Sequence, residues 1–310
     1  MRKIIGIGET ILDLIIKNGQ PTKANPGGSV FNSMVTLGRL GLNPTFLSEV
    51  GNDMVGELIV SFMKENKINT SNLDRFYDGK SPIAMAFLDD KNNAKYQFYI
   101  DYPKKRLDLL FPKIQENDIF IFGSIYALRP ELREKMVELL EYAKAQKAII
   151  YYDPNFRSPH SSELIRLLPT ILENMEYADI VRGSDEDFLN IFGVSDIKKV
   201  YLDKIAYHCP NFICTRGGDG VELFTKTVTT HFDVKPIVPV STIGTGDNFN
   251  AGILFGLLKE NVTKEELPTL SEERWGKIVE SAIAFSSEVC GSLDNYISNE
   301  FAQTYLERLK

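Results

Sequence analysis

The amino-acid sequence predicts an α/β fold: a parallel β-sheet covered by helices on both faces, with a small β-sheet lid. Three observations lead to this prediction. Short apolar runs alternate with amphipathic stretches along most of the chain, as expected for strands and helices joined in βα units. One pair of strand-like runs breaks that alternation. The composition is that of a globular protein, since 43% of the 310 residues are hydrophobic and 25% are charged.

Apolar runs predict six strands of the large sheet, over residues 3–9, 44–51, 118–124, 148–153, 179–184 and 211–218. Helices are predicted between and after them, over residues 29–41, 53–67, 131–146 and 246–260. In the first helix, Val30, Met34 and Leu37 fall on one face, and Gly41 suits the C-cap. Asp53 is the expected N-cap of the second helix.

The lid is predicted from residues 81–100, which read as two strands around the polar turn DDKNNA. A hairpin inside a βα series is an insertion, and it could pair with the strand that runs through residues 11–17. Such a flap beside a parallel sheet can close over a site and exclude water from it. The alternative is an edge hairpin without that role.

Charge and cysteine content exclude several classes of protein. The formal net charge is -7, and no block of Lys and Arg stands out, so neither nucleic acid nor an anionic membrane is expected as a partner. Neither a signal peptide nor a membrane span is predicted. Glycines and acids interrupt the apolar N-terminus, which reads as a strand and not as a signal peptide. No apolar run approaches the roughly 18 residues of a membrane span, so we expect a cytoplasmic protein. Cys209, Cys214 and Cys290 lack the spacing of a disulfide framework or a zinc site.

Ligands of open α/β sheets bind outside the carboxyl ends of the strands, so glycines and polar residues there are candidates. The first strand ends in a GxG, but Ile11 stands where a dinucleotide fingerprint needs its third glycine, which argues against a nicotinamide cofactor. Further on, Gly27 and Gly28 allow another group to approach the backbone closely, and Asn32 offers both a donor and an acceptor. This arrangement suits a polyhydroxylated ligand, although a plain glycine turn with an exposed asparagine would look the same.

The segment IGTGDNFNAG (243–252) places two glycines and Asp247 at the start of an apolar helix. Free amides and the helix dipole make such an end an anion site, and glycines let the amides converge on one group of oxygens. A carboxylate beside bound phosphate would repel it unless it accepted a proton from a nucleophile during phosphoryl transfer. The same dipole favours the ionised form of Asp247. The alternative is that Asp247 only caps the helix.

Two segments of this sequence resemble the signatures of the ribokinase-like (PfkB) carbohydrate kinases. They are GGSVFNSMVTLGRLG with the following LSEVGND, and VSTIGTGDNFNAG. The resemblance covers nearly the whole chain, and DPNFR (153–157) and residues 123–148 look most like the fructokinase branch.

The resemblance implies one ribokinase-like domain over residues 1–310, a three-layer αβα sandwich whose lid comprises residues 11–20 and 81–100. It implies transfer of a phosphoryl group from MgATP to a sugar's primary hydroxyl, with Asp247 as the general base. It also implies the other site residues: the amides of Gly244, Thr245 and Gly246 for the phosphoryl group, Asp13, Gly27, Gly28 and Asn32 for the sugar, Thr215, Gly217 and Gly220 for the nucleotide, and Asn155 and Arg157 near the sugar–phosphate junction.

The sequence departs from the family pattern in three places, one of which is Ile243, where the family usually has threonine. The other two concern metal ions. Ser184 and Asp187 stand where the family has the Asn and Glu of N-x-x-E, which organise magnesium and its waters. Mg²⁺ keeps most of its waters in such sites, so Asp187 is expected to reach the metal through water, on the nucleotide side of the site. Ser241 replaces an acid that in ribokinases helps hold a monovalent cation, which argues against activation by potassium.

Three alternative functions stay open. A 2-keto-3-deoxygluconate kinase would need a cation for the substrate's carboxylate, which could be Lys104, Lys105 or Arg106. A nucleoside kinase would need stacking aromatic rings, for which the lid region offers Tyr96, Phe98, Tyr99 and Tyr102. A sensor that binds sugar or nucleotide without turnover would fit the two departures that concern metal ions. In every case the partners are small molecules, and an apolar face on the protruding lid would suit a homodimer.

Overall fold

The computed structural model describes residues 2–89 and 94–309, and within them the named strands form two sheets. The larger has nine strands in the order β13-β12-β11-β10-β9-β8-β1-β4-β5. Its strands are β1 (Ile4–Ile7), β4 (Thr45–Gly51), β5 (Leu73–Phe76), β8 (Ile119–Gly123), β9 (Ile149–Asp153), β10 (Ile180–Ser184), β11 (Asn211–Thr215), β12 (Val221–Phe224) and β13 (Thr229–Phe232). Neighbours from β5 to β11 run parallel, and β12 and β13 extend the edge as antiparallel strands. All six predicted strands are present.

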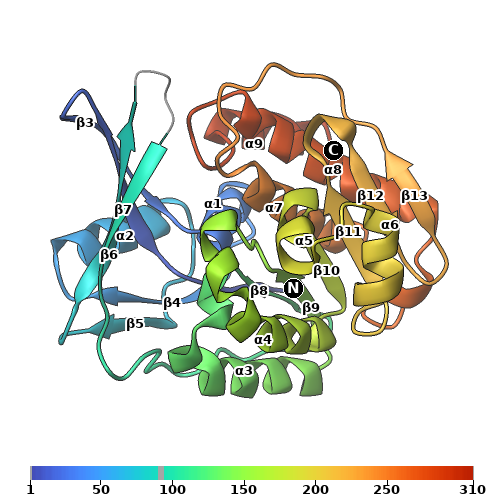
Figure 1. The fold of residues 1–310 in the computed structure, drawn as a ribbon, viewed down its shortest axis with the longest axis horizontal. Helices are drawn as coiled ribbons and strands as arrows, with labels where there is room; N and C mark the ends of the chain where they lie inside the picture. Colours follow the sequence, from blue (N-terminus) through green and yellow to red (C-terminus); the bar gives the residue numbers. More distant parts are fainter. Residues whose placement is uncertain (1, 90–93, 310) are drawn as a thin grey trace.

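Helices cover both faces of this sheet, as Figure 1 shows. Successive residues of a strand point to opposite faces, so Ile4 enters one hydrophobic core and Ile5 the other. The first core is closed by α1 (Ser29–Arg39), α2 (Met54–Glu65), α7 (Thr245–Lys259), α8 (Glu272–Cys290) and α9 (Asn299–Glu307). The second is closed by α3 (Arg133–Ala145), α4 (Leu164–Tyr177), α5 (Asp185–Phe192) and α6 (Ile197–Val200). The predicted α/β architecture is therefore confirmed.

Local signals in the sequence place the ends of α1 and α2 correctly. The Asp53 carboxylate accepts a hydrogen bond of 2.8 Å from the amide of Gly56, which makes Asp53 the N-cap of α2. Gly41 follows α1 with a φ of 78°, a left-handed conformation that glycine adopts without strain.

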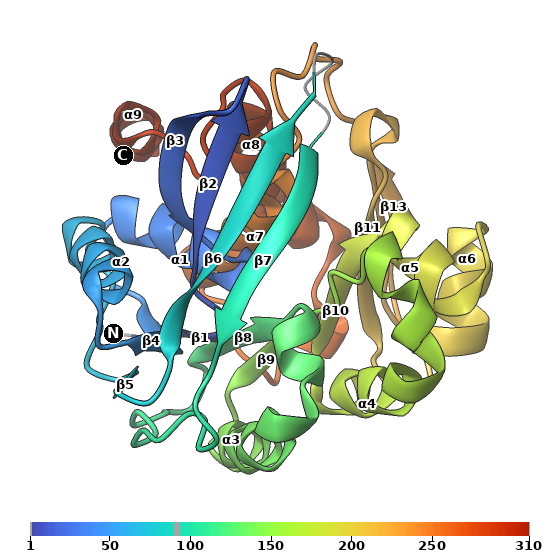
Figure 2. The same cartoon turned by 60° about the vertical axis from the view of Figure 1, so that its left-hand side comes forward.

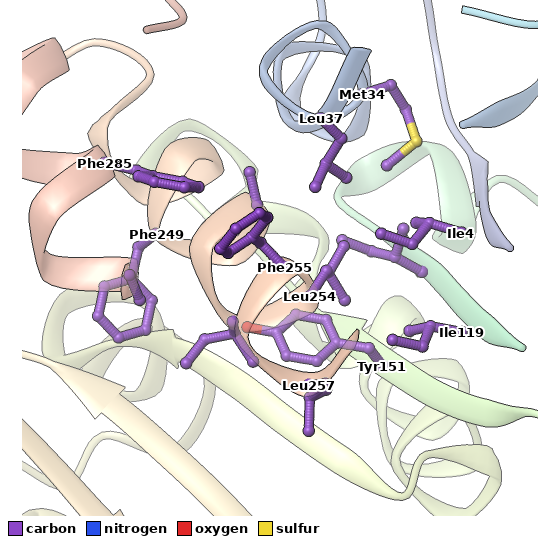
Figure 3. Packing of buried hydrophobic residues seen from close by; sticks show 14 of the residues in the cluster. Ile4, Met34, Leu37, Ile119, Tyr151, Phe249, Leu254, Phe255, Leu257 and Phe285 are labelled. Atoms are coloured by element: carbon purple, nitrogen blue, oxygen red, sulfur yellow. The ribbon is translucent and has the colours of Figure 1, made fainter. Parts of the chain in front are cut away.

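Helix α7 is the centre of the first core, where Phe249, Leu254 and Phe255 are among its buried side chains (Figure 3). It packs against α8 at very short range because it carries glycine at the contact. A Cβ on Gly252 would lie 2.3 Å from the Cα of Ala282, so no larger residue fits without a shift. This packing fixes the N-terminus of α7 relative to the sheet.

The smaller sheet has four strands in the order β3-β2-β6-β7, which stand side by side in Figure 2. They are β2 (Ile11–Lys17), β3 (Gln20–Gly27), β6 (Lys80–Leu88) and β7 (Ala94–Asp101). Both segments predicted for the lid lie in it, although residues 90–93 of the predicted turn fall outside the described part of the chain. The sequence did not predict β3, because QPTKANPG has two prolines and no apolar alternation; such a strand is tolerated at a sheet edge.

Among the described residues, no helix has the length and apolar character needed to cross a lipid bilayer. Cys209 and Cys214 are buried free thiols, and burial raises the pKa of Cys209 to about 12.

Candidate active site

A cleft of about 570 Å³ opens at the carboxyl ends of β9, β10 and β11, against the N-terminus of α7. It brings together most of the residues predicted for the phosphoryl group, the nucleotide and the sugar–phosphate junction. The predicted residues in its lining are Gly244, Thr245, Gly246, Asp247, Thr215, Gly217, Gly220, Ser184, Asn155 and Arg157. The lining does not include the predicted sugar ligands Asp13, Gly27, Gly28 and Asn32 or the predicted metal contact Asp187.

The first turn of α7 is held in place from behind by Asn248. The side-chain amide of this buried residue donates to the carbonyl oxygens of Gly244, at 2.7 Å, and Asn295, at 2.8 Å. Gly244 is the N-cap of α7 with a φ of 76°, which favours glycine. The amide of Thr245 donates to the carbonyl oxygen of Thr242 at a long 3.4 Å, and the next amides of α7 have no partner inside the helix. These residues lie at the wall of the cleft, where such amides can bind an anion.

The Asp247 carboxylate lies between α7 and α1. Its two oxygens accept hydrogen bonds of 2.8 Å from the Ser29 hydroxyl and from the Asn32 side-chain amide. Burial raises the pKa of Asp247 to about 6, even though both hydrogen bonds lower it. The carboxylate is therefore ionised at neutral pH while its pKa is near that of an effective general base. The rise in the pKa of Asp247 that burial causes is therefore larger than the lowering expected from the helix dipole.

Two of the residues predicted to bind the sugar lie at the start of α1: Gly28 is its N-cap and Asn32 is in its first turn. Asn32 is buried, and its side-chain oxygen has no hydrogen-bond partner among the described residues, so it can accept from a ligand. Gly28 has a φ of 134°, and a Cβ there would lie 2.2 Å from the carbonyl oxygen of Glu9. The group that approaches Gly28 closely is thus the protein's own backbone.

Asp13, in the middle of β2, faces Gly27 of the neighbouring strand. A Cβ on Gly27 would lie 2.3 Å from an oxygen of the Asp13 carboxylate. Burial, with a further contribution from the Glu9 carboxylate, raises the pKa of Asp13 to about 7. Glu9 in turn accepts a hydrogen bond of 2.6 Å from the Tyr102 hydroxyl. Two carboxylates therefore lie close to one another at the base of the small sheet.

Ser184 and Asp187 form the capping box that begins α5. One Asp187 oxygen accepts from the amide and hydroxyl of Ser184, at 2.7 and 2.6 Å. The other oxygen has no hydrogen bond from any described residue and lies 3.7 Å from Arg157. No cluster of three or more acidic, histidine or cysteine side chains suited to a metal occurs among residues 2–89 and 94–309.

Sequence reasoning missed two residues that contact this site. Ser29 bonds to Asp247, as described above. Arg182, in the buried strand β10, lies against the first turn of α7, where a Cβ on Gly246 would come within 3.0 Å of its Nη1. A signal for Arg182 was present, because a cationic residue inside an otherwise apolar strand is rarely there for packing alone.

A three-layer α/β sandwich with a separate small sheet, in which helix-terminal amides meet a buried carboxylate, defines the ribokinase-like class of small-molecule kinases. Residues 1–300 match the sequence model of the pfkB family carbohydrate kinases. The chain therefore belongs to this family, and it is an ATP-dependent sugar kinase. The family resemblance noted in the sequence is confirmed.

Curated relatives agree with this assignment, and solved structures agree with the fold. The chain is 29% identical over 286 residues to a fructokinase of Rhizobium leguminosarum bv. trifolii, covering 87% of this chain and 84% of the relative. A fructokinase double mutant of Vibrio cholerae O395, solved with fructose, ADP and potassium, superposes with a TM-score of 0.83 at 20% identity, over 99% of this chain and 98% of that one. Aminoimidazole riboside kinase from Salmonella enterica, solved with its riboside and an ATP analogue, has a TM-score of 0.82 at 22% identity, over all of both chains.

Proposed function

We propose that the enzyme phosphorylates fructose on a primary hydroxyl, with Asp247 as the general base. The observation that carries the base assignment is the carboxylate itself: it is bound by Ser29 and Asn32 and lies one residue from the amides that begin α7. Fructose is favoured because a fructokinase is among the relatives that this chain matches along most of its length.

The proposed reaction follows from this arrangement. The sugar lies among Asp13, Gly27, Gly28 and Asn32, with the reacting hydroxyl against Asp247. Asp247 accepts the hydroxyl proton as the oxygen attacks phosphorus, and the amides of Gly244, Thr245 and Gly246 stabilise the charge on the transferring group. The residues 1–310 act as one kinase domain, and the four-stranded sheet closes over the sugar and excludes water.

The nucleotide is proposed to bind the other end of the cleft, at Thr215, Gly217 and Gly220, with Asn155 and Arg157 near the transferred phosphate. Mg²⁺ would arrive with the nucleotide and be held mainly by phosphate oxygens and water, since no described cluster could hold it directly. The unpartnered oxygen of Asp187 suits a bond from one of those waters. The metal would neutralise charge on the phosphates.

A 2-keto-3-deoxygluconate kinase is less well supported, because two of the three candidate cations are already paired. Arg106 is buried and forms an ion pair with the buried carboxylate of Glu49. Lys105 pairs with Asp108 at 2.6 Å. Glu9 and Asp13 near the sugar position would also repel a carboxylate. A neutral sugar fits these charges better than an acid.

A nucleoside kinase is the second candidate, because Tyr96, Phe98 and Tyr99 of the small sheet are about half exposed and offer aromatic surface on which a base could stack. The deciding experiment measures ADP released from MgATP with fructose, ribose, 2-keto-3-deoxygluconate, tagatose 6-phosphate and adenosine. Fructose is expected to give the highest kcat/KM. A higher value for another substrate would overturn the fructose assignment, and binding of sugar and MgATP without any ADP release would favour the sensor.

A further inference from the structure

Arg182 is a buried cation beside the first turn of α7. Its side chain comes from β10 and is only 5% exposed. It also contributes to the lining of the cleft, beside Gly244, Gly246 and Asp247. None of the roles assigned above uses this residue.

The guanidinium is held from two neighbouring strands. Nη1 donates to the buried carboxylate of Asp153 on β9 at 3.1 Å, and Nη2 donates to the Thr215 hydroxyl on β11 at 2.7 Å. Asp153 is itself fixed from α7, because the same oxygen accepts a bond of 2.6 Å from the side-chain amide of Asn250. The position of the cation is therefore set by both the sheet and the helix.

Most of the guanidinium's donors remain available. Arginine has five N–H groups, and the hydrogen bonds to Asp153 and Thr215 use two of them. Nε has no acceptor among the residues that the structure describes. A Cβ on Gly246 would lie 3.0 Å from Nη1 and 3.3 Å from Nη2, so both η nitrogens lie against the backbone that supplies the anion-binding amides. A buried ion pair rarely contributes much to stability, which points to a role in function.

We propose that Arg182 is a catalytic residue whose spare N–H groups bind the phosphoryl group while it passes from ATP to the sugar. In this step the bond from the γ-phosphorus to the β,γ-bridging oxygen breaks, and that oxygen leaves with ADP and keeps the bonding electron pair. The bond from phosphorus to the sugar oxygen forms, and the hydroxyl proton goes to Asp247. Charge on the three equatorial oxygens is then shared between the amides of α7 and the adjacent Arg182 guanidinium. The proposal rests on the proposed base and anion-binding turn but not on the identity of the sugar.

The test compares Arg182→Met with Arg182→Lys and with a control, Arg133→Met, which removes a partly buried arginine of α3 that pairs with Glu173. Each variant is assayed for kcat and KM with the best substrate of the wild-type enzyme. Binding of MgADP alone, and of MgADP with aluminium fluoride and sugar as a mimic of the transferring group, is measured by calorimetry.

Arg182→Met is expected to lose roughly 10²–10³ in kcat, the usual effect of removing one donor to a transition-state charge. It should bind MgADP within a few-fold of the wild type but lose tight binding of the aluminium fluoride complex. Arg182→Lys should recover part of kcat, and Arg133→Met should change neither quantity. A folded Arg182→Met with nearly normal kcat, or with an effect only on MgADP binding and KM, would overturn the proposal.

If Arg182→Met does not fold, the double variant Asp153→Asn/Arg182→Met is tested in its place. This variant removes both charges of the buried ion pair, so it leaves no unpaired carboxylate at Asp153. Normal kcat in that protein would equally overturn the proposal. Wild-type enzyme that turned over no sugar would instead count against the proposed function. The two failures are thus distinguishable.

Discussion

At the scale of single residues, the site depends on how the environment of Asp247 balances two opposing effects. Burial raises the pKa of this carboxyl group, and the hydrogen bonds from Asn32 and Ser29 lower it. The result, about 6, keeps the group ionised near neutrality and still basic enough to accept a proton.

Replacing the proposed base should abolish most activity without unfolding the protein. Asp247→Asn is expected to lower kcat roughly 10²–10⁴-fold, the usual size of general-base effects. The control is Asp203→Asn, an exposed aspartate outside the lining of the cleft, which should leave kcat unchanged. Steady-state kinetics and the melting temperature are measured for both. If Asp247→Asn had the same kcat as the wild type, Asp247 would not be the base and would only cap the helix.

The pH dependence should follow the same group. Asp247 accepts a proton only when it is ionised, so kcat/KM is expected to fall as the pH drops through about 6. Asn32→Ala removes a hydrogen bond that lowers this pKa, so the acid limb should move to higher pH. Asp13, with a pKa of about 7, titrates nearby, and the profile should be repeated in Asp13→Asn to separate the two groups. If the acid limb of the kcat/KM profile stayed at the same pH in Asn32→Ala, its assignment to Asp247 would be contradicted.

Single residues also show where sequence reasoning stops. The glycines and Asp247 could be predicted because their chemistry is local to the end of one helix. The contact of Ser29 with Asp247 joins residues 218 positions apart, and that of Arg182 with Thr215 joins two strands. Both depend on which elements become neighbours, and no pattern along the chain specifies this.

At the scale of elements, the position of the anion-binding turn depends on how closely α7 packs on α8. Gly252→Val is expected to destabilise the protein by about 1–3 kcal/mol, because its Cβ would lie 2.3 Å from the backbone of Ala282. The matched control is Gly276→Ala on α8, whose Cβ would meet its nearest neighbour at 3.6 Å and should stabilise the helix slightly. Urea denaturation measures both. Equal stability of the two variants would show that the helices can separate at little cost.

Elements with strong periodicity were also the ones that the sequence predicted well. The six buried strands are short, continuous apolar runs, and α1, α2 and α3 have clear apolar faces. Four strands were missed: β3, β5, β12 and β13. β3, β5 and β13 lie at the edge of a sheet, where packing from only one side leaves little sequence signal, and β12 is internal but has only four residues.

At the scale of the whole molecule, the four-stranded sheet leaves an apolar edge uncovered. Tyr96 and Phe98 of β7 stack with ring centroids 6.0 Å apart and are about half exposed. The homodimer expected from the sequence would cover this strand. Phe98→Lys should therefore shift the protein toward monomer in sedimentation velocity. The control is Tyr77→Lys, an exposed aromatic residue outside that sheet, which should not alter association. A wild-type protein that stays monomeric at micromolar concentration would contradict the expectation.

The strand order of the large sheet also determines when each strand can pair with its neighbours during synthesis. Strands β8 to β13 lie in the sheet in the order in which they are synthesised, so each can pair with the strand before it. The buried strand β1 pairs with β8, as Ile4 with Ile119, and must wait for more than a hundred residues to be added. At about 5–20 residues per second, that delay on the ribosome is on the order of ten seconds. During this delay the apolar strand β1 is without β8, one of its two neighbours in the sheet. We therefore expect chaperones to bind the N-terminal part of the nascent chain.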